Sequence, residues 1–166
     1  MTNHQITNQS YAKIQEVVMK KRFFQSFIGA ICFAVLVGTV FAHCEIPCGI
    51  YDDQARINMI LEHITTIEKS MKQIKHLEQE KSPDFNQMVR WIMNKERHAT
   101  EIQTIVAQYF MTQRIKPNDK DYNQKLALLQ QMLVFSMTCK QTTDTQNAAK
   151  LRDVVKQFHQ LYFAGH

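Results

Sequence analysis

Two cysteines lie close together about a quarter of the way along the chain, in the segment VFAHCEIPCGIYDD at residues 40–53. Cys44 and Cys48 are four positions apart, with Pro47 just before the second cysteine and Gly49 just after it. Proline stiffens this short loop, and glycine allows a sharp turn of the backbone that other residues resist. Both thiolates can therefore face one point, where they would bind a soft metal ion.

The residues before this segment have the layout of a secretory signal peptide. Three basic residues at 20–22 precede an apolar stretch at 27–41, and Ala42 supplies a small residue at the expected cleavage position. We therefore expect residues 1–42 to be a leader that is removed. This predicts a periplasmic or secreted protein that meets the membrane only transiently, through its leader. A retained leader would instead anchor the protein, because residues 23–42 could almost span a bilayer.

Cleavage after Ala42 would make His43 the first residue of the mature chain. The α-amine of His43, the amide nitrogen of Cys44 and the two thiolates then offer two nitrogens and two sulfurs, a planar set that suits Ni(II) or Cu(II). The imidazole of His43 can approach from the axial side, and such an electron-rich set makes one-electron redox chemistry accessible. Spacing alone leaves two alternatives open, namely a Cys44–Cys48 disulfide and a zinc site built from His43 and both cysteines.

The rest of the chain, residues 53–166, has the pattern of an all-α protein. The 166 residues include only 4 Gly and 3 Pro, and 45% are apolar, which favours helices around a buried core. Apolar residues recur at spacings of three and four in four stretches, separated by EKSPD, RIKPND and QTTDT. The expected helix starts are Asp52 or Asp53, Ser82 followed by Pro83, about Asp119 and about Asp144. We predict an up-down four-helix bundle preceded by an N-terminal metal-binding hook at residues 43–52.

The spacing also predicts which side chains face the core of the bundle. In the first helix they are Ile57, Ile60, Leu61, Ile64, Ile67, Met71, Ile74 and Leu77. In the second they are Phe85, Met88, Val89, Ile92, Ala99, Ile102, Ile105, Val106, Tyr109 and Phe110. In the third they are Tyr122, Leu126, Leu129, Leu133 and Met137, and in the fourth Ala148, Leu151, Val155, Phe158 and Tyr162.

The charge of the chain argues against a nucleic-acid partner. Four cationic residues against one glutamate leave +3 in residues 1–42, and so only +2 of the total of +5 for the remainder. No dense basic stripe with interleaved aromatic residues is present in the sequence.

The segment HCEIPCGIY resembles the nickel hook, H-C-x-x-P-C-G-x-Y, of nickel-containing superoxide dismutases. The positions that match are His43, Cys44, Pro47, Cys48, Gly49 and Tyr51. The following YDDQARI and the four-helix remainder also fit that family, so the resemblance spans essentially the mature chain.

The resemblance implies a metal, a substrate and a reaction. Nickel would be bound by His43, Cys44 and Cys48, with His43 also serving as the axial ligand in the oxidised state. Tyr51 would stand over the open side and place superoxide, which is disproportionated to dioxygen and hydrogen peroxide through Ni(II)/Ni(III) cycling. The family assembles as a homohexamer, so a homo-oligomer is expected here.

The sequence also departs from the better-known branch of this family. Glu45 stands where that branch has an aspartate, and Asn58 lies near the position of the acidic partner of the axial histidine. Glu62 is one turn further on and is a candidate substitute, and Arg97 is a candidate basic residue behind the site. A secretory leader is a further departure, because the leader cleaved in that branch is of another kind.

Two other functions remain open from the sequence. One is an exported protein that binds nickel or copper through the same hook without turnover, and the other is a secreted helical bundle with a Cys44–Cys48 disulfide. We expect His63 and His98 to be ordinary polar residues of helices and Cys139 to be a buried small residue. We expect Lys69, Lys72 and Lys75 to form a solvated helix face and Trp91 to lie at a subunit contact.

Overall fold

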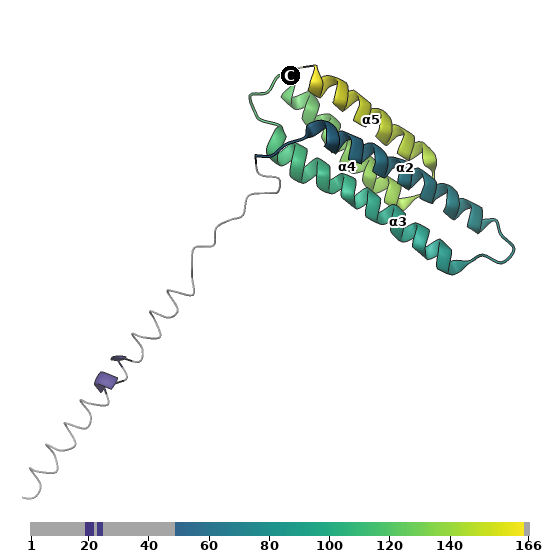
Figure 1. Cartoon of the computed structure of the whole chain (residues 1–166), viewed down its shortest axis with the longest axis horizontal. Coiled ribbons are helices and arrows are strands. Elements are labelled where there is room, and N and C mark those ends of the chain that lie inside the picture. Colours follow the sequence, from purple (N-terminus) through teal and green to yellow (C-terminus); the bar gives the residue numbers. More distant parts are fainter. Residues whose placement is uncertain (1–18, 22, 25–48, 165–166) are drawn as a thin grey trace, which may run out of the picture. The chain divides into compact units, whose positions relative to one another are not determined.

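The computed structural model describes residues 19–21, 23–24 and 49–164 (Figure 1). The chain divides into two units, Met1–His43 and Cys44–His166. Residues 19–21 and 23–24 are helical. The expected cleavage site after Ala42, and the expected metal ligands His43, Cys44 and Cys48, lie outside the described residues. Within the described part of the chain, no helix is both long enough and apolar enough to cross a membrane.

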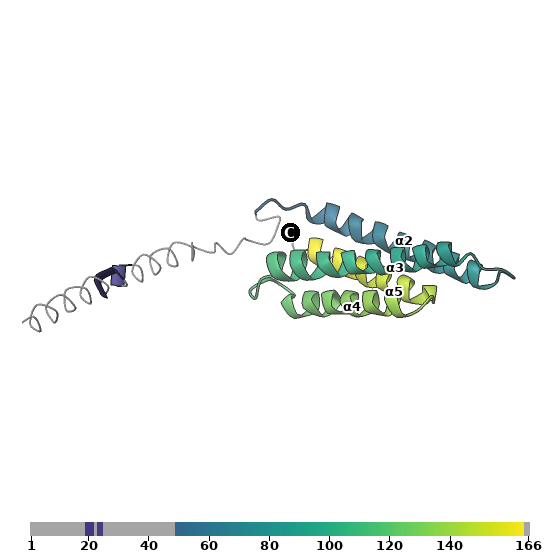
Figure 2. The same ribbon diagram turned by 90° about the horizontal axis from the view of Figure 1, so that it is seen from below.

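Residues 49–164 form an all-helical bundle, and the described segments contain no strand. Its elements are α2 (Asp53–Glu78), α3 (Phe85–Thr104), the π-helix η1 (Ile105–Arg114), α4 (Tyr122–Gln141) and α5 (Thr145–Phe163). Helix pairs in contact are α2 with α3, α3 with α4, α4 with α5, and α5 with α2. Each helix therefore packs against its two neighbours around a square, as Figures 1 and 2 show from two sides. This confirms the predicted helical bundle.

Aspartate side chains start three of the four helical segments. Asp52 accepts a hydrogen bond from the backbone N–H of Ala55 at the start of α2, as predicted, and Asp144 accepts one from Gln146 at the start of α5. The predicted N-cap at Ser82 is wrong, because Asp84 caps α3 and accepts from the backbone N–H of Gln87. Each cap satisfies one N–H that the first helical turn leaves without a backbone partner.

The connection before α4 is a tight turn, and it delays the start of that helix. The backbone N–H of Asp119 donates to the carbonyl of Lys116, with Pro117 at the second position of the turn, where its fixed backbone angle fits. Asp121 then adopts φ 58°, and α4 begins at Tyr122 rather than near Asp119.

The core is made mainly by the predicted faces of α2 and α5. The buried apolar residues include Ile57, Ile60, Ile64, Ile67 and Met71 of α2 and Ala148, Leu151, Val155, Phe158 and Tyr162 of α5. Leu61 is only partly buried. The predicted face of α4 is partly wrong, because Met137 is exposed whereas Leu128, Met132 and Cys139 are buried. Apolar residues occur all around α4, so their spacing did not define one face.

The first half of α3 is the main departure from the predicted core. Phe85, Val89 and Ile92, which we expected to be buried, are exposed together with Met93. Burial on this helix begins at Lys95 and continues through Ala99 and Ile102 into η1. Helices α4 and α5 are shorter than the α2–α3 hairpin, and in both views the tip of that hairpin extends beyond them (Figures 1 and 2).

Candidate functional site

Gly49 is the first residue of the hook that the structure describes. Tyr51 is the hook residue that contacts side chains of the bundle. Gly49 has φ 81°, a conformation that L-amino acids with side chains rarely adopt. A Cβ at this position would meet open space, so the backbone angle itself, and not a close neighbour, favours glycine. This agrees with the sharp turn expected directly after the second cysteine.

A buried network lies directly behind this entry, centred on Asp53 in the first turn of α2. Asp53 Oδ1 accepts hydrogen bonds from Tyr109 Oη at 2.6 Å and Arg114 Nε at 2.8 Å. Asp53 Oδ2 accepts from Tyr162 Oη at 2.7 Å and Arg114 Nη2 at 2.8 Å. All four lone-pair positions of the carboxylate are therefore used. We call Asp53, Tyr109, Arg114 and Tyr162 the Asp53 network; it joins α2, η1 and α5 at one end of the bundle.

The hydrogen bonds of the Asp53 network hold its groups in fixed protonation states. Burial alone would raise the pKa of Asp53, but hydrogen bonds from Arg114, Tyr109 and Tyr162 outweigh it, and the pKa lies below its ordinary value. Burial raises the pKa of Tyr109, and the hydrogen bond to Asp53 raises it further. The same two causes raise the pKa of Tyr162 to about 12. The bond to Asp53 also raises the pKa of Arg114. Near neutral pH the network therefore holds one carboxylate, one guanidinium and two phenols.

Tyr51 rests on this network. Its ring lies 4.3 Å from the guanidinium carbon of Arg114, and its centroid is 5.9 Å from that of Tyr109 in an edge-to-face arrangement. A second arginine, Arg56, lies 5.1 Å from the centroid of the Tyr109 ring. Both are cation–π distances, and Tyr51 is 39% exposed, so one side of it remains open to solvent.

The surroundings of Tyr51 carry more positive than negative charge. Arg114 pairs with the carboxylate of Asp53, Arg56 lies against the Tyr109 ring, and the Nζ of the buried Lys125 lies 5.5 Å from the Tyr162 ring. Asp52 at the surface offsets part of this charge. A small anion approaching Tyr51 therefore meets a favourable potential.

Three residues that the sequence placed near the metal lie on α2 and α3, and their contacts with the hook ligands fall outside the described residues. Asn58 accepts a hydrogen bond from Gln54, and Glu62 lies beside a pair of histidines further along α2. Arg97 donates to Asn94 on α3, about three helical turns before Tyr109. None of the interactions that we find links these residues to Tyr51 within the described part of the chain.

The two helix histidines form a pair rather than two separate surface groups. His63 Nδ1 and His98 Nδ1 are 2.8 Å apart and link α2 to α3. Cys139 is fully buried, as predicted, and burial raises its pKa to about 11, so that its thiol stays protonated. Lys69, Lys72 and Lys75 are exposed, as expected.

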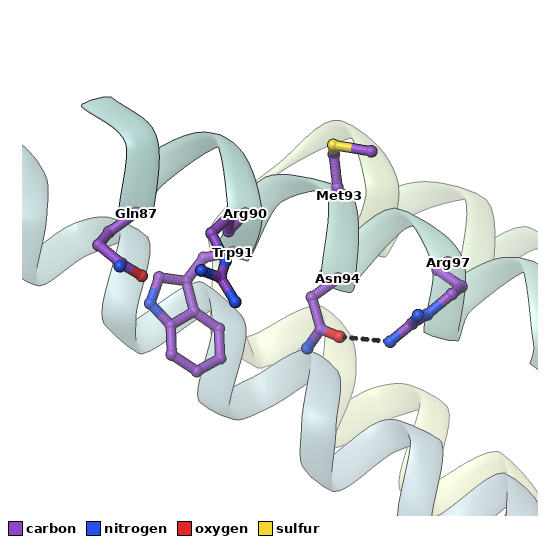
Figure 3. Close-up of a pocket in the computed structure, with 6 residues that line it drawn as sticks. All are labelled: Gln87, Arg90, Trp91, Met93, Asn94 and Arg97. Atoms are coloured by element: carbon purple, nitrogen blue, oxygen red, sulfur yellow. Dashed lines mark hydrogen bonds between the residues drawn. The ribbon is translucent and has the colours of Figure 1, made fainter. Parts of the chain in front are cut away.

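A surface pocket of about 490 Å³ lies on α3 (Figure 3). It is lined by Gln87, Arg90, Trp91, Met93, Asn94 and Arg97. The Nζ of Lys69 lies 5.8 Å from the Trp91 ring. The expected role of Trp91 at a subunit contact stays a prediction.

The expected donor set for a metal ion belongs to the hook. Among residues 19–21, 23–24 and 49–164, no group of three or more His, Cys, Asp or Glu side chains is placed to hold a metal ion. The two thiols and the histidine of His43, Cys44 and Cys48 immediately precede Gly49. Thiolate sulfur with amine and amide nitrogen is a set that fits Ni(II).

The fold is a helical bundle, and the sequence places the candidate metal ligands directly before it. In a comparison with known families, the model of nickel-containing superoxide dismutase matches residues 38–165. Comparisons with curated proteins and with solved structures gave no match. The chain belongs to the family of nickel-containing superoxide dismutases. It is therefore an oxidoreductase, and its cofactor is nickel.

The hydrogen bonds that join Asp53, Arg114 and Tyr162 were not predicted from the sequence. Asp53 was expected to be an N-cap and Tyr162 an ordinary core residue, and Arg114 was not considered. A tyrosine in an otherwise apolar face is the signal that was available, because a buried phenol needs a hydrogen-bond partner. The sequence does not show which residue provides that partner.

Proposed function

We propose that this protein disproportionates superoxide at a nickel ion held by His43, Cys44 and Cys48, with Tyr51 over the open side. The observation that carries this proposal is the placement of Tyr51. It lies three residues after the second cysteine and rests on a saturated network of charged and phenolic groups. A chelator without turnover has no need of a fixed, partly exposed phenol beside its metal.

Each residue of the proposed site has a separate task. The thiolates of Cys44 and Cys48, and the amine and imidazole of His43, bind the metal and set its potential. Tyr51 positions superoxide and ordered water, and the cationic groups behind it favour entry of the anion. When bound, nickel supplies one-electron chemistry, by which two superoxide ions and two protons give dioxygen and hydrogen peroxide.

The site also requires processing of the chain. We propose that residues 1–42 are removed during export, because only cleavage after Ala42 frees the α-amine of His43 as a ligand. The mature protein, with a hook at 43–52 and a bundle at 53–166, would then act outside the cytoplasm. We further propose a homohexamer, as the family resemblance implies; the exposed side chains of Phe85, Val89 and Met93 are apolar surface that contact between copies would bury.

The proposal is tested by intact mass and metal analysis of protein recovered from its own export route. We expect a mass that starts at His43, about one nickel per chain, and superoxide dismutase activity. The variant Cys44→Ser should lose both nickel and activity, because one thiolate is removed from the metal. Cys139→Ser is the matched control and should keep its nickel.

Each alternative function gives a different result. A protein with nickel but without dismutase activity would be a metal-handling protein. A mature chain that is lighter by two hydrogen atoms and free of metal would be a bundle with a Cys44–Cys48 disulfide. A mass that retains Ala42 would leave no free amine at His43 and would contradict the proposed ligand set.

A further inference from the structure

Tyr51 lies before the first helix of the bundle, so helical hydrogen bonds do not hold it. Helix α2 begins at Asp53, and the backbone at Gly49 adopts a conformation typical of a turn. A side chain that must stay in place over a metal needs support from other groups. The aromatic and cation–π contacts of Tyr51 join it to Tyr109 and Arg114.

Arg114 is itself held rigidly. Its Nε and Nη2 donate to the two oxygens of Asp53, each at 2.8 Å, which is the bidentate geometry of an arginine–carboxylate pair. The side chains of Arg114 and Asp53 are only 25% and 13% exposed. Two hydrogen bonds in one plane fix the orientation of the guanidinium, so its flat face presents a fixed surface to the ring of Tyr51.

The π-helix η1 is what brings Arg114 to this position. In an α-helix, residues five positions apart point about 140° away from each other, so Tyr109 and Arg114 would face different directions. In η1 the hydrogen bonds join residues five apart, as between the Ile115 N–H and the Phe110 carbonyl at 3.0 Å. Residues five apart then point in more similar directions than in an α-helix, and both Tyr109 and Arg114 reach Asp53. Such π-helical turns are rare and often occur at functional sites.

The Asp53 network is suited to positioning rather than to proton transfer. The pKa values of Tyr109 and Tyr162 are raised, and that of Asp53 is lowered, away from neutrality. These groups therefore keep their charges near neutral pH. The Asp53 network therefore keeps the same hydrogen bonds and the same charges beside Tyr51.

We propose that Arg114, oriented by Asp53, is the positioning residue for Tyr51. Its guanidinium lies against the Tyr51 ring and limits the orientations that the ring can adopt. This inference rests on the proposed function for its catalytic consequence, but the contact itself can be tested without the metal.

The test compares Arg114→Met with Arg152→Met. Arg152 is a matched control, because it forms an ion pair with Glu68 at 3.0 Å and has 26% of its side chain exposed, but it lies elsewhere on the bundle. In nickel-free protein with ring-labelled tyrosine, nuclear magnetic resonance reports the Tyr51 ring, which is assigned with Tyr51→Phe. In nickel-loaded protein, kcat, KM and nickel content are measured together.

We expect the Tyr51 ring signals of Arg114→Met to move towards those of a free tyrosine, while the signals of Tyr122 stay in place. We expect kcat to fall about tenfold with unchanged nickel content, since small displacements of a positioned group cost this much or more. Arg152→Met should leave the Tyr51 ring signals in place and kcat within twofold of the wild-type value. If Arg114→Met does not fold, Arg114→Gln, which still donates to Asp53, takes its place with the same expectations.

Unchanged Tyr51 signals in a folded Arg114 variant would overturn the proposal. So would a kcat equal to that of Arg152→Met. A wild-type protein that binds nickel but has no dismutase activity would overturn the proposed function instead, and the ring signals would still decide whether Arg114 holds Tyr51.

Discussion

The two arginines beside Tyr51 differ in how their charge is balanced. Arg114 is neutralised by a bidentate pair with Asp53. Arg56 lies over the Tyr109 ring and donates to Met59 Sδ at 3.6 Å, and within the described residues we find no carboxylate paired with it. Arg56 therefore provides the less compensated positive charge beside the proposed entry for superoxide.

We expect Arg56→Met to lower kcat/KM for superoxide about two- to fivefold at low ionic strength, because less of the anion is attracted to the site. The difference from wild type should shrink as salt is added, since exposed charges more than about 10 Å apart are largely screened at 0.1 M salt. Steady-state rates at several salt concentrations measure this effect.

The control for Arg56→Met is Lys75→Met, which removes one exposed positive charge in the last turn of α2, at the far end of the bundle. Equal losses for both variants would show that only the total charge matters. A loss that salt does not change would show a structural role for Arg56.

The hook could be predicted from the sequence because its chemistry is local. His43, Cys44, Cys48 and Tyr51 lie within nine positions, and their types and spacing define a donor set without knowledge of the fold. The Asp53 network could not be predicted in the same way. Its partners come from η1 and α5, more than fifty residues from Asp53, and only packing brings them together.

At the scale of the helices, Lys95 closes the end of α4. It is 3% exposed, and its Nζ donates to the carbonyls of Cys139 at 2.9 Å and Thr142 at 3.4 Å, and to that of Lys140. The last carbonyls of a helix have no partner within the helix and carry partial negative charge. A lysine from α3 supplies both the hydrogen bonds and the compensating charge.

We expect Lys95→Met to lower the free energy of unfolding by about 2–3 kcal/mol, since it removes hydrogen bonds from a charged donor and leaves buried carbonyls without a partner. Urea unfolding followed by circular dichroism measures the change. Lys156→Met is the control; its side chain is 62% exposed and 3.8 Å from Asp153, and exposed pairs of this kind contribute little. A similar effect of both variants would rule out the proposed role of Lys95.

Helix existence followed from the sequence, whereas some starts and faces did not. The stripe of α5 and most of that of α2 were correct because each has apolar residues on one side only. The stripe of α3 was wrong at Phe85, Val89 and Ile92 because α4 and α5 are too short to cover that part. The change from α-helix to π-helix at Ile105 depends on the contacts of η1, which the spacing of apolar residues does not reveal.

At the scale of the whole bundle, the pair of His63 and His98 makes the free energy of unfolding depend on pH. Burial lowers the pKa of both histidines. The negative charges of Glu101 and Glu62 partly oppose this lowering, whereas the positive charge of Arg97 lowers the pKa of His98 further. His63 Nε2 is buried and has no hydrogen-bond partner in the described structure. The neutral tautomer of His63 that fits this environment carries its proton on Nδ1, facing His98, and leaves Nε2 without a proton. Protonation would place a second N–H where we find no acceptor.

We therefore expect the free energy of unfolding to fall as the pH decreases from 7 to 5. A histidine whose pKa is lower in the folded state binds its proton more weakly there than in the unfolded chain. At pH values between the lowered pKa and the ordinary value of 6.5, the unfolded state binds more protons, so acid favours unfolding. Above pH 6.5 these two histidines do not make the free energy of unfolding depend on pH. Urea unfolding at several pH values, with the double variant His63→Leu/His98→Leu, measures this. The double variant should have a shallower slope between pH 5 and 7, whatever its stability at pH 8. An unchanged slope would mean that other groups cause the loss of stability in acid.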